Sequence, residues 1–315
     1  MAKKPSILLS GFLVITLLSG CKEQSAKNHH PLNEVVYKDT CFYLAKAPKL
    51  PEKIEFASET APIEQVQFAE RLDKELLVNS FWHNNTILGL KRAQRFFPLI
   101  ESILLEEEVP DDFKFLALIE SNLDLVVSPA GAAGYWQFLE STAKQYNLQV
   151  NPEVDERYHI EKSTRAACTY LKDMYSKFRS WTLAAASYNM GSAALEREME
   201  RQGVENYYDL HLNNETSRYI FRILALKCIY QNPEDYGIFI QNSLTYNEYI
   251  TTPLVVDSTI SNMYDFAKKQ GTTYQLIKLL NPWIRSNKLS IEKNKKYTIL
   301  IPEEEGNIKP YIPVN

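Results

Sequence analysis

The sequence of 315 residues predicts a mainly α-helical protein, in which an all-α body is followed by a small β-α-α-β module. Between Pro62 and Tyr230, apolar residues recur every three or four positions, which is the period of an α-helix, and strand-like runs are short. After Asn242 two β-rich runs enclose two short amphipathic stretches, within about sixty residues. This order of elements predicts a separate unit at 245–304.

The N-terminal residues predict a secretory signal. Lys3 and Lys4 precede an apolar run from Ile7 to Leu18, which is too short for a comfortable membrane span. Leu18-Ser19-Gly20-Cys21 then resembles a bacterial lipobox, which implies cleavage after residues 1–20 and lipid attachment to Cys21. A cleaved soluble secretory peptide and an uncleaved N-terminal anchor are the alternatives.

The residues after Cys21 predict a tether to a membrane and indicate which membrane it is. Residues 21–60 are polar and rich in Lys, Glu and Pro, and we interpret them as a tether between membrane and body. Lys22 is not the aspartate that retains lipoproteins at the inner membrane. We therefore expect a lipid-anchored protein of the cell envelope, at the periplasmic face of the outer membrane.

The predicted helices of the body follow in order. In an N-terminal helical segment at 61–108, the first helix has one face formed by Phe68, Ala69, Leu72 and Leu76. A second helix runs through Arg92, Phe96, Ile100 and Leu104. Pro110-Asp111-Asp112 is a helix-start signal before a helix that reaches Ser121. Further helices are predicted at 163–178, 181–188 and 215–230, with Ser163 as the N-cap of the first.

Composition excludes several classes of protein. The formal net charge is −4, and removal of the signal takes away two lysines and no acid, leaving −6. An acidic body argues against nucleic acid as a partner, since that needs a basic face. Cys41, Cys168 and Cys228 are an odd number and make no disulfide framework. The histidines show no metal-ligand spacing, so we expect no metal and no cofactor.

One carboxylic acid stands at the end of a helix that is apolar on every side. Consecutive apolar residues between Phe113 and Ile119 predict that this helix is buried, and Glu120 follows them directly. Burial and the negative end of the helix dipole both raise the pKa of a carboxyl group there. Glu120 is thus a candidate general acid. The alternative is an ordinary solvated glutamate at a helix end.

The small residues after this helix suggest a ligand. Gly131 and Gly134 have no side chains to keep a sugar from the backbone, and Tyr135, Trp136 and Gln137 follow with flat apolar rings and an amide. Aromatic faces with hydrogen-bonding amides are typical of carbohydrate sites. A glycine-rich helix junction with core aromatics is the alternative.

Four short motifs in this order resemble the lytic murein transglycosylases of the goose-lysozyme-like superfamily, which carry the transglycosylase SLT domain of glycoside hydrolase family 23. They are Glu120-Ser121, Gly131 to Phe138, Ser187 to Gly191, and Glu215 to Tyr219. The membrane-bound D type fits best, because it shares the run Ser-Pro-Ala-Gly-Ala-Ala-Gly at 128–134. Departures from the pattern are Ser187 in place of Ala, His159 in place of Asp, and a link between Glu120 and Ser128 that is one residue shorter.

The resemblance implies a lysozyme-like all-α catalytic domain at 109–241. It implies that Glu120 alone serves as acid and then base in cutting the β-1,4 bond between N-acetylmuramic acid and N-acetylglucosamine, without water, to leave 1,6-anhydro ends. It implies substrate binding by Ser121, Gln137, Tyr188, Asn189 and Tyr219, while Trp136 shapes the cleft floor. The expected partner is the peptidoglycan glycan strand, and we expect a monomer. A lysozyme-type hydrolase and a non-catalytic wall-binding lipoprotein are the alternatives.

The C-terminal module resembles a divergent LysM domain. Leu279-Leu280-Asn281-Pro282 stands in its second predicted helix, although the usual Gly-Asp before the first helix is missing. A LysM domain would bind glycan, whereas the alternative is a structural cap without a ligand.

Overall fold

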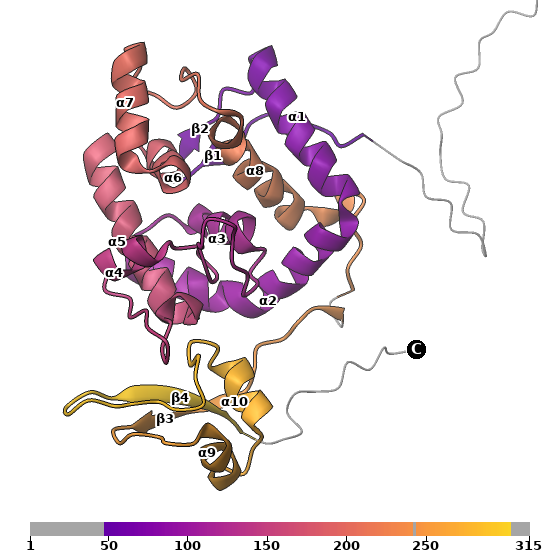
Figure 1. Cartoon of the computed structure of the whole chain (residues 1–315). Coiled ribbons are helices and arrows are strands. Elements are labelled where there is room, and N and C mark those ends of the chain that lie inside the picture. The colour runs from indigo at the N-terminus through magenta and orange to yellow at the C-terminus, as the bar shows by residue number, and fades with distance from the viewer. Residues whose placement is uncertain (1–46, 242–243, 304–315) are drawn as a thin grey trace, which may run out of the picture. The chain divides into compact units, whose positions relative to one another are not determined.

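A computed structural model describes residues 47–241 and 244–303 (Figure 1). The described residues all belong to one compact unit. The predicted signal, Cys21 and Cys41 lie outside the described residues. In the described ranges, no helix is both long enough and apolar enough to cross a membrane.

The body is helical, as the sequence predicts. Its helices are α1 (Val66–Phe81), α2 (His83–Glu106), α3 (Lys114–Ser121), α4 (Glu140–Gln145), α5 (Ile160–Phe178), α6 (Trp181–Met190), α7 (Ser192–Gln202) and α8 (Asn214–Gln231). Short 3-10 helices lie at Asp111–Phe113, Glu156–Tyr158 and Pro233–Tyr236, and a hairpin of two-residue strands joins β1 (Glu55–Phe56) to β2 (Glu59–Thr60).

Helix α3 lies inside the body, framed by α1, α2, α5 and α8 (Figure 1). Five of its consecutive residues, 114–118, are buried, which agrees with the expectation from its unbroken apolar run. Helix α8 packs against α1, α3 and α6 and buries residues on most of its sides. The α3–α8 contact therefore brings the first and fourth sequence motifs together.

The start of the body and the N-cap of α5 differ from the sequence predictions. Ile54 and Phe56 lie in the hydrophobic core, and the Phe56 ring packs edge-on to Phe113 at 5.0 Å, so the predicted tether does not extend to residue 60. The N-cap of α5 is His159, not Ser163, because the helix begins at Ile160. Ser163 is buried in the first turn, where its hydroxyl donates to the Ile160 carbonyl.

The C-terminal module has the predicted β-α-α-β order: β3 (Thr251–Val256), α9 (Met263–Lys269), α10 (Tyr274–Leu280) and β4 (Tyr297–Pro302). Strands β3 and β4 pair antiparallel, with Thr251 opposite Pro302 and Val256 opposite Tyr297. Asn281 is fully buried, and its side chain bonds the backbone of Ile277 and Leu300. The asparagine of the Leu-Leu-Asn-Pro motif thus ties the end of α10 to β4.

The segment before α5 contacts this module. Val154 and Ile284 form an antiparallel bridge, and the Asp155 amide donates to the Trp283 carbonyl at 2.9 Å. Val154 and Tyr158 are buried in the hydrophobic cluster of the module and not in that of the body. The module is therefore packed on the body by backbone pairing and by apolar burial.

Candidate active site

Glu120 lies at the C-terminal end of α3, where Asn122 ends the helix in the left-handed conformation (φ 54°). Its side chain points toward α8, and its Oε1 accepts a hydrogen bond from the Tyr219 hydroxyl. Tyr219 is buried on α8, within the fourth sequence motif. The two residues are 99 positions apart in the chain and meet because α3 packs on α8.

Opposing influences act on the Glu120 carboxyl group. Burial raises its pKa and is the largest influence, as expected for a carboxylate removed from water. The hydrogen bond from Tyr219 and the positive charge of Arg222 lower the pKa, while the negative charge of Glu215 raises it. The net result is a raised pKa, so Glu120 holds its proton to a higher pH than an ordinary glutamate.

Glu120 faces a cavity of about 500 Å³. The side chains that matter for its chemistry come from α1, α2, α3, α8 and their ends: Glu75, Trp82, Asn85, Glu120, Glu215 and Arg222. Asp124, the acid nearest in sequence, is not among the lining residues and instead pairs with Arg92 at 2.6 Å. Asp124 is thus no second carboxylate of this cavity.

Among the predicted binding residues, Tyr188 and Tyr219 have pKa values that the charge of Glu120 affects. The Tyr188 hydroxyl donates to the Trp136 carbonyl at 2.7 Å. Burial, followed by the negative charge of Glu120, raises the pKa of both tyrosines well above the ordinary value. Both rings therefore stay neutral, and their hydroxyls remain hydrogen-bond donors next to the carboxyl group.

The other predicted binding residues have partners inside the protein. Ser121 lines the cavity, but its hydroxyl is buried and donates to the Tyr135 carbonyl at 2.7 Å. The Gln137 amide donates to two backbone carbonyls, at 2.9 and 3.0 Å. Asn189 donates to Glu215 at 3.1 Å and accepts from a threonine hydroxyl at 2.7 Å. The motifs thus meet around Glu120, while direct binding of sugar by these three residues stays a prediction.

Gly134 in the glycine-rich stretch is required by the packing of the protein backbone around it. Gly134 has φ 79°, and a Cβ atom there would lie 1.9 Å from the Arg157 carbonyl oxygen, so a larger residue cannot fit. Trp136 is fully buried, and its indole donates to the Thr164 hydroxyl at 2.9 Å. Trp136 therefore does not line the cavity of Glu120, and its part in shaping the cleft floor stays a prediction. The close approach that Gly134 permits is to protein backbone.

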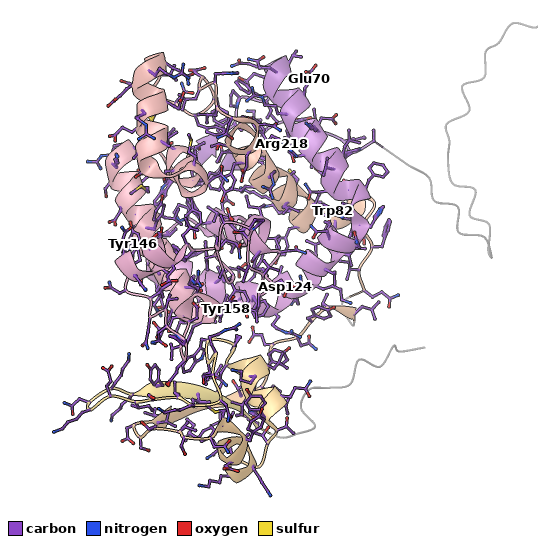
Figure 2. The ribbon with its side chains drawn as sticks, viewed as in Figure 1. Glu70, Trp82, Asp124, Tyr146, Tyr158 and Arg218 are labelled. Atoms are coloured by element: carbon purple, nitrogen blue, oxygen red, sulfur yellow. The ribbon has the colours of Figure 1, made fainter. Side chains whose placement is uncertain are left out.

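Several cavity residues escaped the sequence analysis. Glu75 is buried and forms a two-pronged ion pair with Arg218, at 2.6 and 3.1 Å. Trp82 lies at the junction of α1 and α2 (Figure 2). An exposed tryptophan between two helices indicates a candidate binding residue. Only the fold shows that Trp82 borders the cavity of Glu120.

Comparison with known proteins agrees with this geometry. Residues 100–210 match the family described as "Transglycosylase SLT domain", and residues 252–305 match "Soluble lytic transglycosylase C-terminal LysM-like domain". Two relatives, both named "Membrane-bound lytic murein transglycosylase D", come from Escherichia coli strains K12 and O6:H1. Each is 27% identical over 250 residues, which cover 78% of this chain and 53% of the relative.

A further relative is named "Putative tributyltin chloride resistance protein", from Alteromonas sp. (strain M-1). It is 29% identical over 127 residues, covering 36% of this chain and 61% of the relative. The chain spans about half the length of the two murein transglycosylase relatives. The resemblance seen in the sequence motifs is confirmed: the chain contains a transglycosylase SLT domain followed by a LysM-like domain of the kind found at the C-terminus of soluble lytic transglycosylases.

Proposed function

We propose that this protein is a peptidoglycan lytic transglycosylase, which cuts the β-1,4 bond between N-acetylmuramic acid and N-acetylglucosamine without consuming water. The observation that carries the proposal is Glu120, a carboxyl group of raised pKa on the wall of a cavity of about 500 Å³. The match of residues 100–210 to the SLT domain supports it.

Glu120 supplies both proton transfers of the proposed reaction. In the first step its carboxyl proton moves to the glycosidic oxygen, the C1–O bond breaks, and the acetamido oxygen of the same muramic acid residue stabilises C1. In the second step the ionised Glu120 takes the proton of the C6 hydroxyl, whose oxygen forms the new bond to C1. The products are a free 4-hydroxyl group and a 1,6-anhydro ring, so no water enters.

The surroundings of Glu120 suit a group that must exist in two charge states. Burial favours the neutral acid that begins the reaction, whereas Tyr219 and Arg222 favour the anion that forms during it. The Arg222 guanidinium is held in place by donation to the Ile119 carbonyl at 3.2 Å, one residue before Glu120. We infer that this balance lets a single carboxyl group act as acid and then as base.

Product analysis tests the proposal. Digestion of intact sacculi with the purified protein should release muropeptides that are lighter by one water than hydrolysis products and lack a reducing end, as mass spectrometry measures. Glu120→Gln keeps the shape of the side chain but cannot donate a proton, and should lower the rate by about 10² to 10⁴. Unchanged clearing of sacculi by Glu120→Gln would rule out Glu120 as the acid.

A lysozyme-type hydrolase is the second candidate, and Glu215 favours it. This residue lines the same cavity, and its negative charge raises the pKa of Glu120, so a second carboxylate stands near the first. A hydrolase could use such a group to activate water. Products that carry one added water and a reducing end would establish hydrolysis and overturn the anhydro mechanism.

We propose that the enzyme works in the cell envelope, as a monomer anchored by a lipid on Cys21 at the periplasmic face of the outer membrane. The lipobox-like sequence before Cys21 supports the anchor, and the two relatives named as membrane-bound support the location. We assign residues 61–108 to an N-terminal helical segment, residues 109–241 to the lysozyme-like catalytic domain and residues 245–304 to the LysM-like module. Mass spectrometry of the mature N-terminus would contradict the anchor if Cys21 were absent or carried no lipid.

A further inference from the structure

The cavity of Glu120 extends beyond the residues that match the SLT domain. Val78, Trp82 and Asn85 line it from the junction of α1 and α2, ahead of the match at 100–210. Trp82 is the single residue between these helices, with φ −87° and ψ 55°, which is neither helical nor extended. The helix junction therefore places an indole ring at one end of the cavity that holds Glu120.

Trp82 stands apart from the other tryptophans of the chain. Its exposed fraction is 55%, whereas Trp136 and Trp283 are buried and Trp181 stacks on Tyr175 at 4.1 Å. Among the described residues, the Trp82 ring has no aromatic partner and its indole N–H has no hydrogen-bond acceptor. Val78, one helical turn earlier, is 40% exposed. Exposed apolar surface of this kind at a cavity rim is typical of a binding site.

The polar groups beside Trp82 decide which ligand fits. Asn85 and Asn214 offer side-chain amides in the same cavity, and such groups bond hydroxyl and acetamido groups. Arg218 is already paired with the buried Glu75, so its guanidinium is not free to bind a phosphate or a peptide carboxylate. A flat apolar ring next to neutral amides suits an uncharged pyranose ring.

We propose that Trp82 is a sugar-binding residue, whose indole stacks on a pyranose ring of the glycan strand close to the bond that is cut. Glu120 and Trp82 line one continuous cavity, so the glycan strand that reaches Glu120 also contacts Trp82. The inference rests on the proposed function, because it takes the glycan strand as the substrate. It assigns helices α1 and α2 a part in holding substrate.

Binding without cleavage gives the cleanest test. The full chain with Glu120→Gln, kept in mild detergent, is titrated calorimetrically with glycan strands from which an amidase has removed the peptides. Adding Trp82→Ala should weaken binding about tenfold, since truncation of a contacting tryptophan commonly costs that much or more. Trp82→Phe retains a flat ring and should stay within about threefold of the Glu120→Gln parent.

A matched control separates stacking from general loss of surface. Phe239→Ala removes an aromatic ring that is 74% exposed and does not line the cavity, and should leave binding unchanged. Trp82→Ala should also unfold at the parental temperature, because the ring buries little. Equal affinity of Trp82→Ala and its parent overturns the proposal, and so does an equal loss in Trp82→Phe.

The outcomes for Trp82 and for the proposed function are distinguishable. If Trp82→Ala weakens binding but the wild-type chain releases no anhydro products, the stacking site stands and the transglycosylase proposal fails. If the wild-type chain releases anhydro products and Trp82→Ala binds as tightly as its parent, only the stacking site fails. Glycan should also shield Trp82 from acrylamide quenching; shielding of Trp82 by the chain itself, in the absence of glycan, would overturn the assignment.

Discussion

At the scale of single residues, the hydrogen bond from Tyr219 lowers the pKa of the Glu120 carboxyl group. The Tyr219 hydroxyl donates to Glu120 and lowers a pKa that burial raises, so removing that hydroxyl should raise the pKa further. Activity that needs protonated Glu120 is lost as pH rises through this pKa. Tyr219→Phe should therefore shift the alkaline limb of the pH–rate profile to higher pH and lower kcat, because the anion formed during reaction loses its donor.

The pH–rate profile on sacculi, measured beside a control, decides this point. Tyr264→Phe is the control, since Tyr264 is 54% exposed in the C-terminal module and should leave the profile unchanged. A limb that moves to lower pH in Tyr219→Phe, or does not move, would contradict the role given to this hydrogen bond.

At the scale of elements, some structure can be predicted from sequence and some cannot. The unbroken apolar run of α3 predicts its burial, and Glu120 stands out as its polar end. The sequence does not predict helix α7, because Leu195 is its single buried residue and leaves no apolar stripe. The ion pair of Glu75 and Arg218 joins positions 143 apart, and no local pattern contains such a contact.

At the same scale, Arg157 and its hydrogen bonds form a clamp around the glycine-rich turn. Arg157 is held by the Asp155 carboxylate at 2.7 Å and donates to the carbonyls of Gly131 and Phe138, at 3.0 and 3.2 Å. The turn between those carbonyls contains Tyr135, whose own carbonyl accepts from Ser121 beside Glu120. The guanidinium thus fixes the turn that supports the end of α3 at Glu120.

Arg157→Lys should loosen this clamp, because an ammonium group cannot reproduce the planar fork of bonds. We expect the free energy of unfolding to fall by about 2 kcal/mol, the scale of a lost buried bond to a charged group, and activity to fall with it. Arg201→Lys is the control in denaturant titrations, since its side chain is 63% exposed and surface pairs contribute less than about 1 kcal/mol. Equal stabilities of the two variants would show that the clamp has no such role.

At the scale of the whole molecule, the backbone bridge and the apolar contacts between module and body predict that the two are stabilised together. The β-α-α-β order can be predicted from the change of periodicity after Asn242. The contact itself cannot, because the backbone bridge between Val154 and Ile284 joins segments whose sequences show no pairing signal. Val154 and Tyr158 depend on the module for their burial.

A chain that ends at residue 241 should therefore be less stable than the full chain. Uncovering Val154 and Tyr158 should cost about 2 kcal/mol of unfolding free energy, which corresponds to a Tm lower by about 4–8 °C for a body of this size. Differential scanning calorimetry measures both chains, and the full chain should unfold in one transition. Two separate transitions, with the body unfolding at the same temperature in both chains, would show instead that the module is an independent domain.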